Sequence, residues 1–218
     1  MSDKETNIKE KLIQALTSTI RVISDDLQIL KKSEKDENSN KFDFAVLGNL
    51  NNKNDFIRAR AEADSAALKK KFSNNRIYKK NLPNNSSCKS LYAIAEKVRY
   101  ETLGGKMFKG IKKNFKDNYN QVVSFKTKDQ LKTKKDVPVA EAFELYMLKN
   151  FHNIKLTSLT SKMLNFWEKD FEQSINKHIL YLKEKLEDQD NYSERFSQIL
   201  EKMNIFQNKY NLTSFFKS

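Results

Sequence analysis

The amino-acid sequence predicts a mainly α-helical protein, and two observations support that prediction. Only four glycines and two prolines occur in 218 residues, so few residues interrupt regular helices. Apolar residues also recur every three or four positions along most of the chain, which is the spacing of one helix face. We therefore expect a multi-helix bundle, with aromatic residues, 11% of the chain, available for its core.

The charged residues divide the chain into three regions, which are candidate domains. Residues 1–50 contain 8 basic and 9 acidic residues, residues 51–135 contain 22 and 7, and residues 136–218 contain 11 and 12. The middle region therefore carries a net charge of +15, whereas the whole chain carries +13. Such a region should attract an acidic partner or a polyanion. We expect residues 51–135 and 136–210 to pack into one domain, preceded by residues 1–50.

The first 50 residues should form one helix and a small β-hairpin. Residues 5–23 show apolar side chains at helical spacing, among them Leu12, Leu16 and Ile23. Two apolar-alternating runs, DLQILKK and KFDFAVLG, then flank a polar turn, which favours a hairpin near residues 26–47. A lone hairpin is only marginally stable in water, so it would have to lean on the helices.

The basic middle region should begin with two helices. The first is expected over residues 55–72, and Asp64 falls inside its apolar stripe, where a buried carboxylate would need a partner. Residues 73–87 should be mainly a loop. The second helix begins near residue 86, and the adjacent glycines Gly104 and Gly105 should either end it or kink it.

A third helix of the middle region should carry a basic stripe. Its apolar face is expected to comprise Met107, Phe108, Ile111 and Phe115. Lysines spaced three, four and three residues apart should lie together on its other side, namely Lys106, Lys109, Lys113 and Lys116.

Residues 136–210 should add a C-terminal helical part. Asp136 and Pro138 mark the start of one helix, and Thr157 is a candidate N-cap for the next. Apolar stripes then run through residues 171–188 and 192–207, separated by a short polar turn. This pattern is typical of an antiparallel helical hairpin.

No local residue pattern points to catalysis or metal binding by this chain. The single cysteine, Cys88, excludes a disulfide framework and a cysteine-based zinc site. His152 and His178 lie far apart and show no ligand spacing, and four scattered glycines make no phosphate-binding loop. The polar N-terminus, the lack of a long apolar run and the lone cysteine favour a cytoplasmic protein with no membrane span.

Charged residues just before the double glycine form two pairs at helical spacing. Glu96 and Arg99 are three positions apart, and Lys97 and Glu101 are four apart. Salt bridges at these spacings contribute only about 0.2–0.5 kcal/mol on an exposed helix. We expect these residues at the surface.

The same stretch, AIAEKVRYETLGGKMFKGIKKNF, resembles the signature of the CobT-type subunit of aerobic cobaltochelatase. That signature has the form E-Q-A-R-V-E-A-x-G followed by M-x-G-V-x-x-N-L. Its positions match Glu96, Arg99, Glu101, Gly104, Met107, Gly110 and Asn114. We call residues 96–114 the signature segment. Upstream, RARAEADSAALK resembles the family's R-x-x-A-D-x-x-A-L, chiefly through Arg60 and Asp64. The similarity covers roughly residues 54–206 and is weak over the first 50.

The resemblance implies an accessory role in an ATP-dependent reaction. Aerobic cobaltochelatase inserts cobalt into a corrin ring in cobalamin biosynthesis, using ATP, magnesium and cobalt. A large subunit binds the tetrapyrrole and metal, while an AAA+ ATPase subunit and the CobT-type subunit form a motor. The resemblance therefore implies a chain that binds no cofactor itself and is inactive alone. The signature residues would then serve either in partner binding or in the structure of the chain. Because Asp64 falls inside an apolar stripe, we further hypothesise that it pairs with Arg99 in a helix–helix contact.

CobT-type chains usually continue into an acidic linker and a von Willebrand factor A domain with a metal site. This sequence ends at Ser218, so we expect a fragment, a split subunit or a degenerate paralogue, with a separate von Willebrand factor A domain as a further candidate partner.

A basic helical nucleic-acid-binding protein is the alternative interpretation. The +15 region and the lysine stripe favour it, because phosphate contacts rely on such cations. The scarcity of arginine and the expected inward position of the aromatic residues argue against it, because lysine alone reads few base edges. An autonomous enzyme has no residue pattern in its support.

Overall fold

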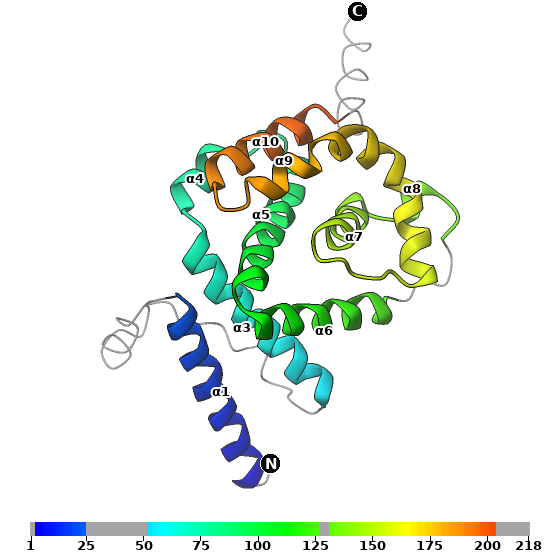
Figure 1. Cartoon of the computed structure of the whole chain (residues 1–218). Coiled ribbons are helices and arrows are strands. Elements are labelled where there is room, and N and C mark those ends of the chain that lie inside the picture. Colours follow the sequence, from blue (N-terminus) through cyan, green and yellow to red (C-terminus); the bar gives the residue numbers. More distant parts are fainter. Residues whose placement is uncertain (1–2, 25–51, 127–130, 204–218) are drawn as a thin grey trace, which may run out of the picture.

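A computed structural model describes residues 3–24, 52–126 and 131–203, and every regular element within these ranges is a helix (Figure 1). The prediction of a mainly α protein is confirmed, whereas the hairpin predicted near residues 26–47 lies outside the described residues. The N-terminal and basic regions contain α1 (Asp3–Ser24), α3 (Lys53–Phe72), α4 (Asn75–Lys80), α5 (Ser86–Met107) and α6 (Lys109–Phe125). The remainder contains η2 (Lys134–Asp136), α7 (Val139–Phe151), α8 (Ser158–Ile175), η3 (Asn176–His178), α9 (Ile179–Glu184) and α10 (Gln189–Glu201).

Helix α5 is the hub of the fold. It packs against α3, α6, α7 and α10, so both the basic region and the C-terminal region rest on it. Tyr92, Ala95 and Val98 are among its fully buried residues, and one hydrophobic core extends from α3 to α10. Its N-cap is Asn85, whose side chain accepts a hydrogen bond from the backbone N–H of Ser87. The helix also continues without a break through Gly104 and Gly105 to Met107, so it ends after the double glycine and not at it.

Helix α7 lies within a frame formed by α5, α6, α8 and the α9–α10 pair in Figure 1. Its surroundings explain its composition, because a helix covered on several sides can be apolar around most of its circumference. Seven of its thirteen residues are buried, namely Ala142, Phe143, Leu145, Tyr146, Met147, Leu148 and Phe151. It follows Pro138, as predicted, and Thr157 caps α8 in a capping box with Thr160.

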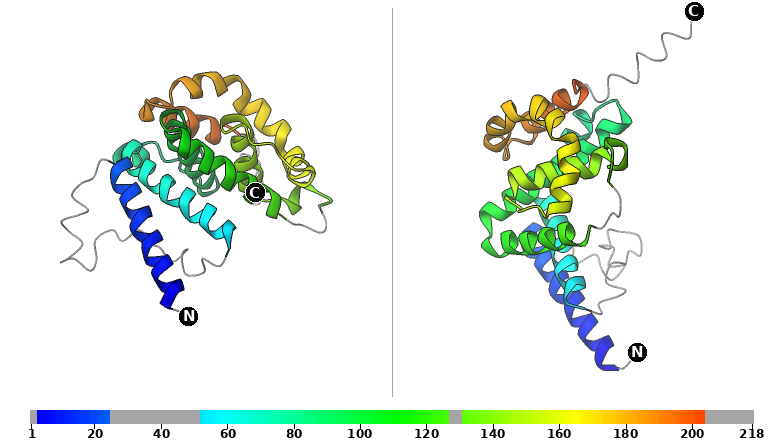
Figure 2. Two further views of the ribbon diagram at one scale, coloured as in Figure 1. Left: turned by 60° about the horizontal axis from the view of Figure 1, so that its bottom comes forward. Right: turned by 90° about the vertical axis from the view of Figure 1, so that its right-hand side faces the viewer.

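Helix α1 packs along α3 and extends away from the helices around α7 (Figures 1 and 2). Leu16, Ile20 and Ile23 form its buried face. The residues between α3 and α5, expected to be mainly a loop, contain the short helix α4, which contacts α10. Asn74 caps α4 by accepting a hydrogen bond from the backbone N–H of Arg76.

The long helix predicted over residues 171–188 is broken in two. Helix α8 ends at Ile175, a 3-10 turn follows, and α9 ends at Glu184. The predicted apolar positions Phe171, Ile175 and Leu182 are nevertheless all fully buried. Two helices meeting at a bend can satisfy a 3.6-residue repeat as well as one straight helix does, so the pattern could not show the break.

Candidate functional site

The first charged pair of the signature segment is buried in the core, which corrects the expectation that it lies at the surface. Arg99 is only 1% exposed, and its Nε donates to Glu96 Oε2 at 3.3 Å. The guanidinium also donates to the backbone carbonyls of Leu186 at 3.0 Å and Phe72 at 2.6 Å. A third bond reaches the Ser73 hydroxyl at 3.3 Å. Arg99 thereby ties α5 to the C-terminal end of α3 and to the turn before α10.

The partner carboxylate, Glu96, is equally well satisfied. Ser193 donates to its Oε1 at 2.5 Å, and Gln189 Nε2 donates to its Oε2 at 3.1 Å. Gln189 in turn accepts from the backbone N–H of Asn74 at 2.6 Å, ahead of α4. A buried ion pair whose remaining donors and acceptors are bonded holds elements in register. Because Glu96 and Arg99 are occupied inside the fold, we assign them a structural role.

Glu101 forms a second buried cluster, together with three residues that local sequence patterns did not reveal. Its Oε1 accepts from the Ser65 hydroxyl at 2.6 Å, and its Oε2 accepts from Tyr119 at 2.5 Å. His152 Nε2 lies 3.8 Å from Oε2 and has no hydrogen-bond partner within the described part of the chain. The salt bridge that the spacing of Lys97 and Glu101 allows is absent from the described residues, and the Lys97 ammonium lies over the Tyr119 ring, 5.7 Å from its centroid. The four groups come from α3, α5, α6 and the end of α7, so only the tertiary fold brings them together.

Burial disfavours the charged forms of both Glu101 and His152 in this second cluster. Loss of hydration raises the pKa of Glu101, against the opposing effects of Lys97 and of its hydrogen bonds. Loss of hydration, with a further contribution from the Lys97 charge, lowers the pKa of His152 to about 4. His152 is therefore neutral near pH 7, and its 3.8 Å contact with Glu101 is not an ion pair there.

A cavity of about 240 Å³ opens beside this cluster, between α3, α5 and α6. Its lining combines the Glu101 carboxyl group and the Tyr119 ring with Ser65 and two lysines, Lys69 and Lys97. Three of its polar lining groups, those of Ser65, Glu101 and Tyr119, are bonded to one another.

Asp64 does not pair with Arg99, and that prediction is wrong. Its carboxylate accepts from Asn114 Nδ2 at 2.6 Å, which links α3 to α6. Burial raises the pKa of Asp64, while the Asn114 hydrogen bond and the charge of Arg60 lower it. Arg99 instead reaches the C-terminal end of α3, where it donates a hydrogen bond to the backbone carbonyl of Phe72. Asp64 and Asn114, which both match the family motifs, therefore bind each other within the fold. The Arg60 side chain is exposed.

Gly104 allows α5 and α3 to approach closely. A Cβ at this position would lie 2.3 Å from Cδ1 of Leu68, which is fully buried. Real Cβ contacts essentially never approach so closely, so a larger residue would force the Leu68 side chain to move. Helix packing therefore requires glycine here.

The last part of the signature segment lies on the surface, and its predicted orientation is partly wrong. Ile111 and Phe115 are buried as predicted, but Met107 is 56% exposed and Phe108 is 38% exposed. The helix break at Phe108 causes the difference, because α6 starts a new axis and the residues before Ile111 no longer share its apolar face. Gly110 is also exposed, and a Cβ added there would have no neighbouring atom within 4 Å.

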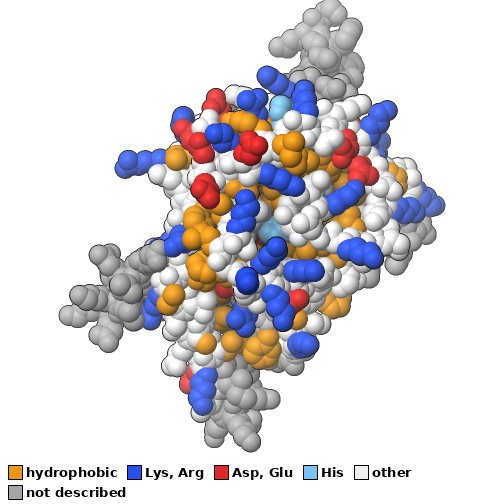
Figure 3. All heavy atoms as spheres, in the orientation of Figure 1, with side chains coloured by type: hydrophobic (Ala, Val, Ile, Leu, Met, Phe, Trp, Pro, Cys, Tyr) orange, Lys and Arg blue, Asp and Glu red, His pale blue; other side chains and the backbone are white. Residues whose placement is uncertain are grey.

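The lysines of the predicted stripe are all exposed, although they do not lie on one helix. Lys106 belongs to the last turn of α5, whereas the other three, Lys109, Lys113 and Lys116, lie on α6. Figure 3, drawn in the orientation of Figure 1, shows basic side chains over much of this face, including its lower part, where α6 runs. Acidic side chains lie mainly along its upper edge, over α9 and α10.

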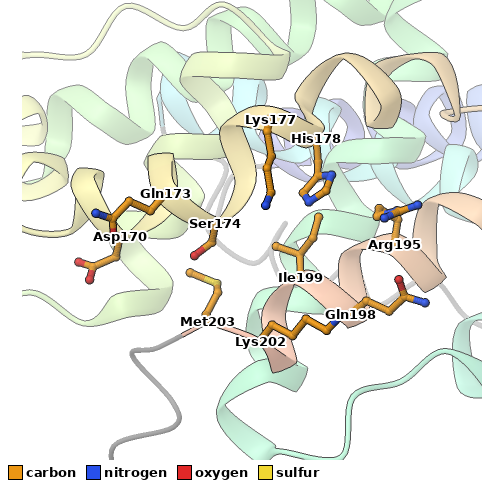
Figure 4. Close-up of a pocket in the computed structure, with 10 residues that line it drawn as sticks. All are labelled: Asp170, Gln173, Ser174, Lys177, His178, Arg195, Gln198, Ile199, Lys202 and Met203. Carbon is orange, nitrogen blue, oxygen red and sulfur yellow. The ribbon is translucent and has the colours of Figure 1, made fainter.

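A second cavity of about 260 Å³ lies between α8, η3 and α10 (Figure 4). Lys177 and His178 point toward α10 in this view, and Arg195 and Lys202 extend from the opposite wall. Asp170 stands at its rim, where its carboxylate accepts from Lys134 at 2.6 Å. No local sequence signal identified this basic cavity, since its residues come from three elements, α8, η3 and α10.

Neither a metal site nor a reactive thiol is evident among the described residues. No group of three or more His, Cys, Asp or Glu side chains in these ranges could hold a metal ion. Burial raises the pKa of the Cys88 thiol to about 11, which makes it a poor nucleophile. Among the described helices, none has the length and apolar character that crossing a membrane requires.

The fold and the site define a mainly helical protein whose signature segment combines a buried polar network with exposed residues on a basic surface. A family model described as cobalamin biosynthesis protein CobT matches residues 6–213, and the chain belongs to that family. Family membership implies a role in cobalamin biosynthesis. The match also includes most of the first 50 residues, where the motifs showed little similarity. No curated protein and no solved structure matches the chain.

Proposed function

We propose that this chain is a non-catalytic subunit of an ATP-dependent cobaltochelatase, which inserts cobalt into a corrin ring in the cytoplasm. It would act with an AAA+ ATPase subunit and with the large subunit that binds the tetrapyrrole. Membership of the CobT family supports this proposal. One structural observation carries it further. Glu96, Arg99 and Glu101 are occupied by internal bonds, while exposed signature residues lie on a basic surface.

In this proposal the chain binds neither ATP, magnesium nor cobalt, and the other subunits hold them. Its own contribution is mechanical. The Glu96–Arg99 network joins α3, α5 and α10 into a stiff unit, and the α5–α6 surface offers cations to a partner. A stiff unit suits a subunit that transmits movement of an ATPase, because it moves as a whole and does not deform.

Reconstitution from purified components tests the proposal. The full chain, the AAA+ ATPase subunit and the large subunit are mixed with the corrin substrate, cobalt, magnesium and ATP, and metal insertion is followed by the absorption spectrum of the corrin. We expect insertion with all three proteins, and none when this chain is left out or when ATP is replaced by a non-hydrolysable analogue. A further reaction adds a separate von Willebrand factor A domain protein. Insertion at an unchanged rate without this chain would refute the proposal.

Nucleic-acid binding remains a second candidate, and one observation favours it. Phe108 is exposed between Lys106 and Lys109, and an aromatic ring beside cations can stack on a base. A mobility-shift assay with single- and double-stranded DNA, at rising salt, tests this candidate. Binding through phosphates must weaken steeply with salt, and absence of a shift at low salt excludes it.

A further inference from the structure

The corner where α5 ends and α6 begins exposes two large apolar side chains side by side in the sequence. Met107 is 56% exposed and Phe108 is 38% exposed. The other large apolar side chains exposed in the described residues, such as Val22, Phe125 and Leu180, each stand alone in the sequence. Single exposed apolar residues are common on protein surfaces, whereas an adjacent pair at a corner more often marks a contact. Among the described residues, no element covers these two side chains fully.

Gly110 is the third unusual feature of this corner. It occupies the first turn of α6, where glycine weakens a helix, yet no atom lies within 4 Å of the position of an added Cβ. Gly104, six residues earlier, is required because Leu68 fills the space. At Gly110, no neighbour in the described part of the chain requires a glycine. A surface approaching from outside would benefit from the missing side chain, because it could come close to the backbone.

The charge around these residues has one sign. Five exposed lysines surround the corner or follow it along α6, namely Lys106, Lys109, Lys112, Lys113 and Lys116. Within the described ranges, no carboxylate lies within ion-pair distance of any of them. Helix α6 contains a single acidic residue, Asp117, and has neither an acidic residue nor a side-chain cap at its start. The positive end of the helix dipole therefore adds to the lysine charges.

We infer that this corner, formed by Met107, Phe108 and Gly110 with Lys106, Lys109 and Lys113, is a docking surface for an acidic protein segment. The segment presents an apolar side chain to Met107 and Phe108 and places carboxylates against the lysines on either side. The inference rests on the proposed function, because it assigns the segment to the AAA+ ATPase subunit. A second copy of this chain fits poorly, since it would bring a net charge of +13.

Binding of the full chain to the purified AAA+ ATPase subunit tests the inference, measured by isothermal titration calorimetry at low and high salt. Two double variants test the apolar and the charged parts of the surface separately. The first combines Met107→Ser with Phe108→Ser, and the second combines Lys109→Glu with Lys113→Glu. Each is expected to weaken binding by about tenfold or more, because apolar anchors and facing charges carry most of the affinity of an interface. Binding by the wild type should also weaken with salt.

The matched control is the double variant Lys155→Glu with Lys162→Glu, which makes the same change in charge at two other exposed lysines. Lys155 lies between α7 and α8, and Lys162 lies on α8. It should change the affinity by no more than about twofold, apart from the long-range effect of net charge. Circular dichroism melting confirms that each variant is folded, which is expected because all the altered side chains are exposed.

Three results would overturn the inference, and they can be told apart. If the wild type binds the ATPase and both corner variants bind equally well, the surface is wrong while the proposed function stands. If the wild type does not bind the ATPase, the proposed function fails and takes the inference with it. If the corner variants lose binding to DNA and keep binding to the ATPase, the surface is a nucleic-acid site instead.

Discussion

The two ends of the signature segment have opposite surroundings. Residues 96–104 are mainly buried in the centre of the fold, where Glu96 and Arg99 bind each other and three neighbouring elements. Residues 107–110 are exposed, and none of their side chains has a polar partner in the described residues. A single stretch of sequence therefore combines a structural part with a part that is free to meet a partner. A match to a family signature does not by itself distinguish these two kinds of residue.

A second comparison shows why sequence spacing alone misjudges the charged pairs. Asp55–Arg58 and Glu96–Arg99 are both carboxylate–arginine pairs three residues apart, with N–O distances of 3.5 and 3.3 Å. The arginine is 49% exposed in the first pair and 1% exposed in the second. Exposed pairs contribute little to stability, whereas breaking a buried pair leaves an uncompensated charge in the core. The contribution of such a pair to stability depends on its burial, which cannot be predicted from the sequence spacing.

The largest expected effect comes from removing the buried arginine. Arg99→Met should lower the free energy of unfolding by about 3–5 kcal/mol, because Glu96 loses its counter-ion and two carbonyls lose their donor. Arg58→Met is the matched control and should cost less than about 1 kcal/mol. Urea denaturation measures both. A double variant, Glu96→Gln with Arg99→Met, should lose less than the sum of the single losses, since the buried charge is then absent. Equal losses for Arg99→Met and Arg58→Met would contradict the distinction.

Two glycines of the same segment provide a second, smaller test. Gly104→Ala should cost about 1–3 kcal/mol, because its Cβ would collide with the buried side chain of Leu68. Gly110→Ala should instead stabilise the isolated chain by about 0.5–1 kcal/mol, because the space is open and alanine favours helix. Thermal melting of the two variants gives opposite shifts in Tm if the comparison is right. Destabilisation by Gly110→Ala would show that the fold itself requires this glycine.

A third test depends on pH and concerns His152. Its pKa is lowered to about 4 in the folded chain, so the unfolded chain takes up the proton first as the pH falls. The folded state should therefore lose stability between about pH 6.5 and pH 4, by roughly 2 kcal/mol at pH 5. His152→Gln removes this loss, whereas Glu101, with its raised pKa and opposite dependence, stays in both proteins.

Urea denaturation at pH 7.5 and pH 5 measures the difference between wild type and His152→Gln. His178→Gln is the control, because the pKa of His178 is lowered too but this residue lies near the surface, so its effect should be smaller. A gap between wild type and His152→Gln that stays constant with pH would show that His152 does not titrate in this window.

Sequence patterns found the helices more reliably than the site. The apolar repeats located α5, α7 and α8, because a helix face depends mainly on residues three and four apart. They did not show that Met107 and Phe108 lie outside the core, because the axis of the chain changes at Phe108. They also could not find the partners of Glu101, since Ser65, Tyr119 and His152 are distant in sequence. Asp64 was recognised as needing a partner, but the partner predicted for it was wrong.

The sequence by itself determined the helical class, the concentration of positive charge in residues 51–135 and the resemblance to the CobT family. Each of these depends on composition or on residues close together along the chain. Only the tertiary structure decided which signature residues are buried and which are exposed. Burial depends on which helices meet, as when Gly104 meets Leu68 and Glu96 meets Ser193 across nearly a hundred residues. For this reason the basic corner at Met107 and Phe108 could be recognised only once the fold was known.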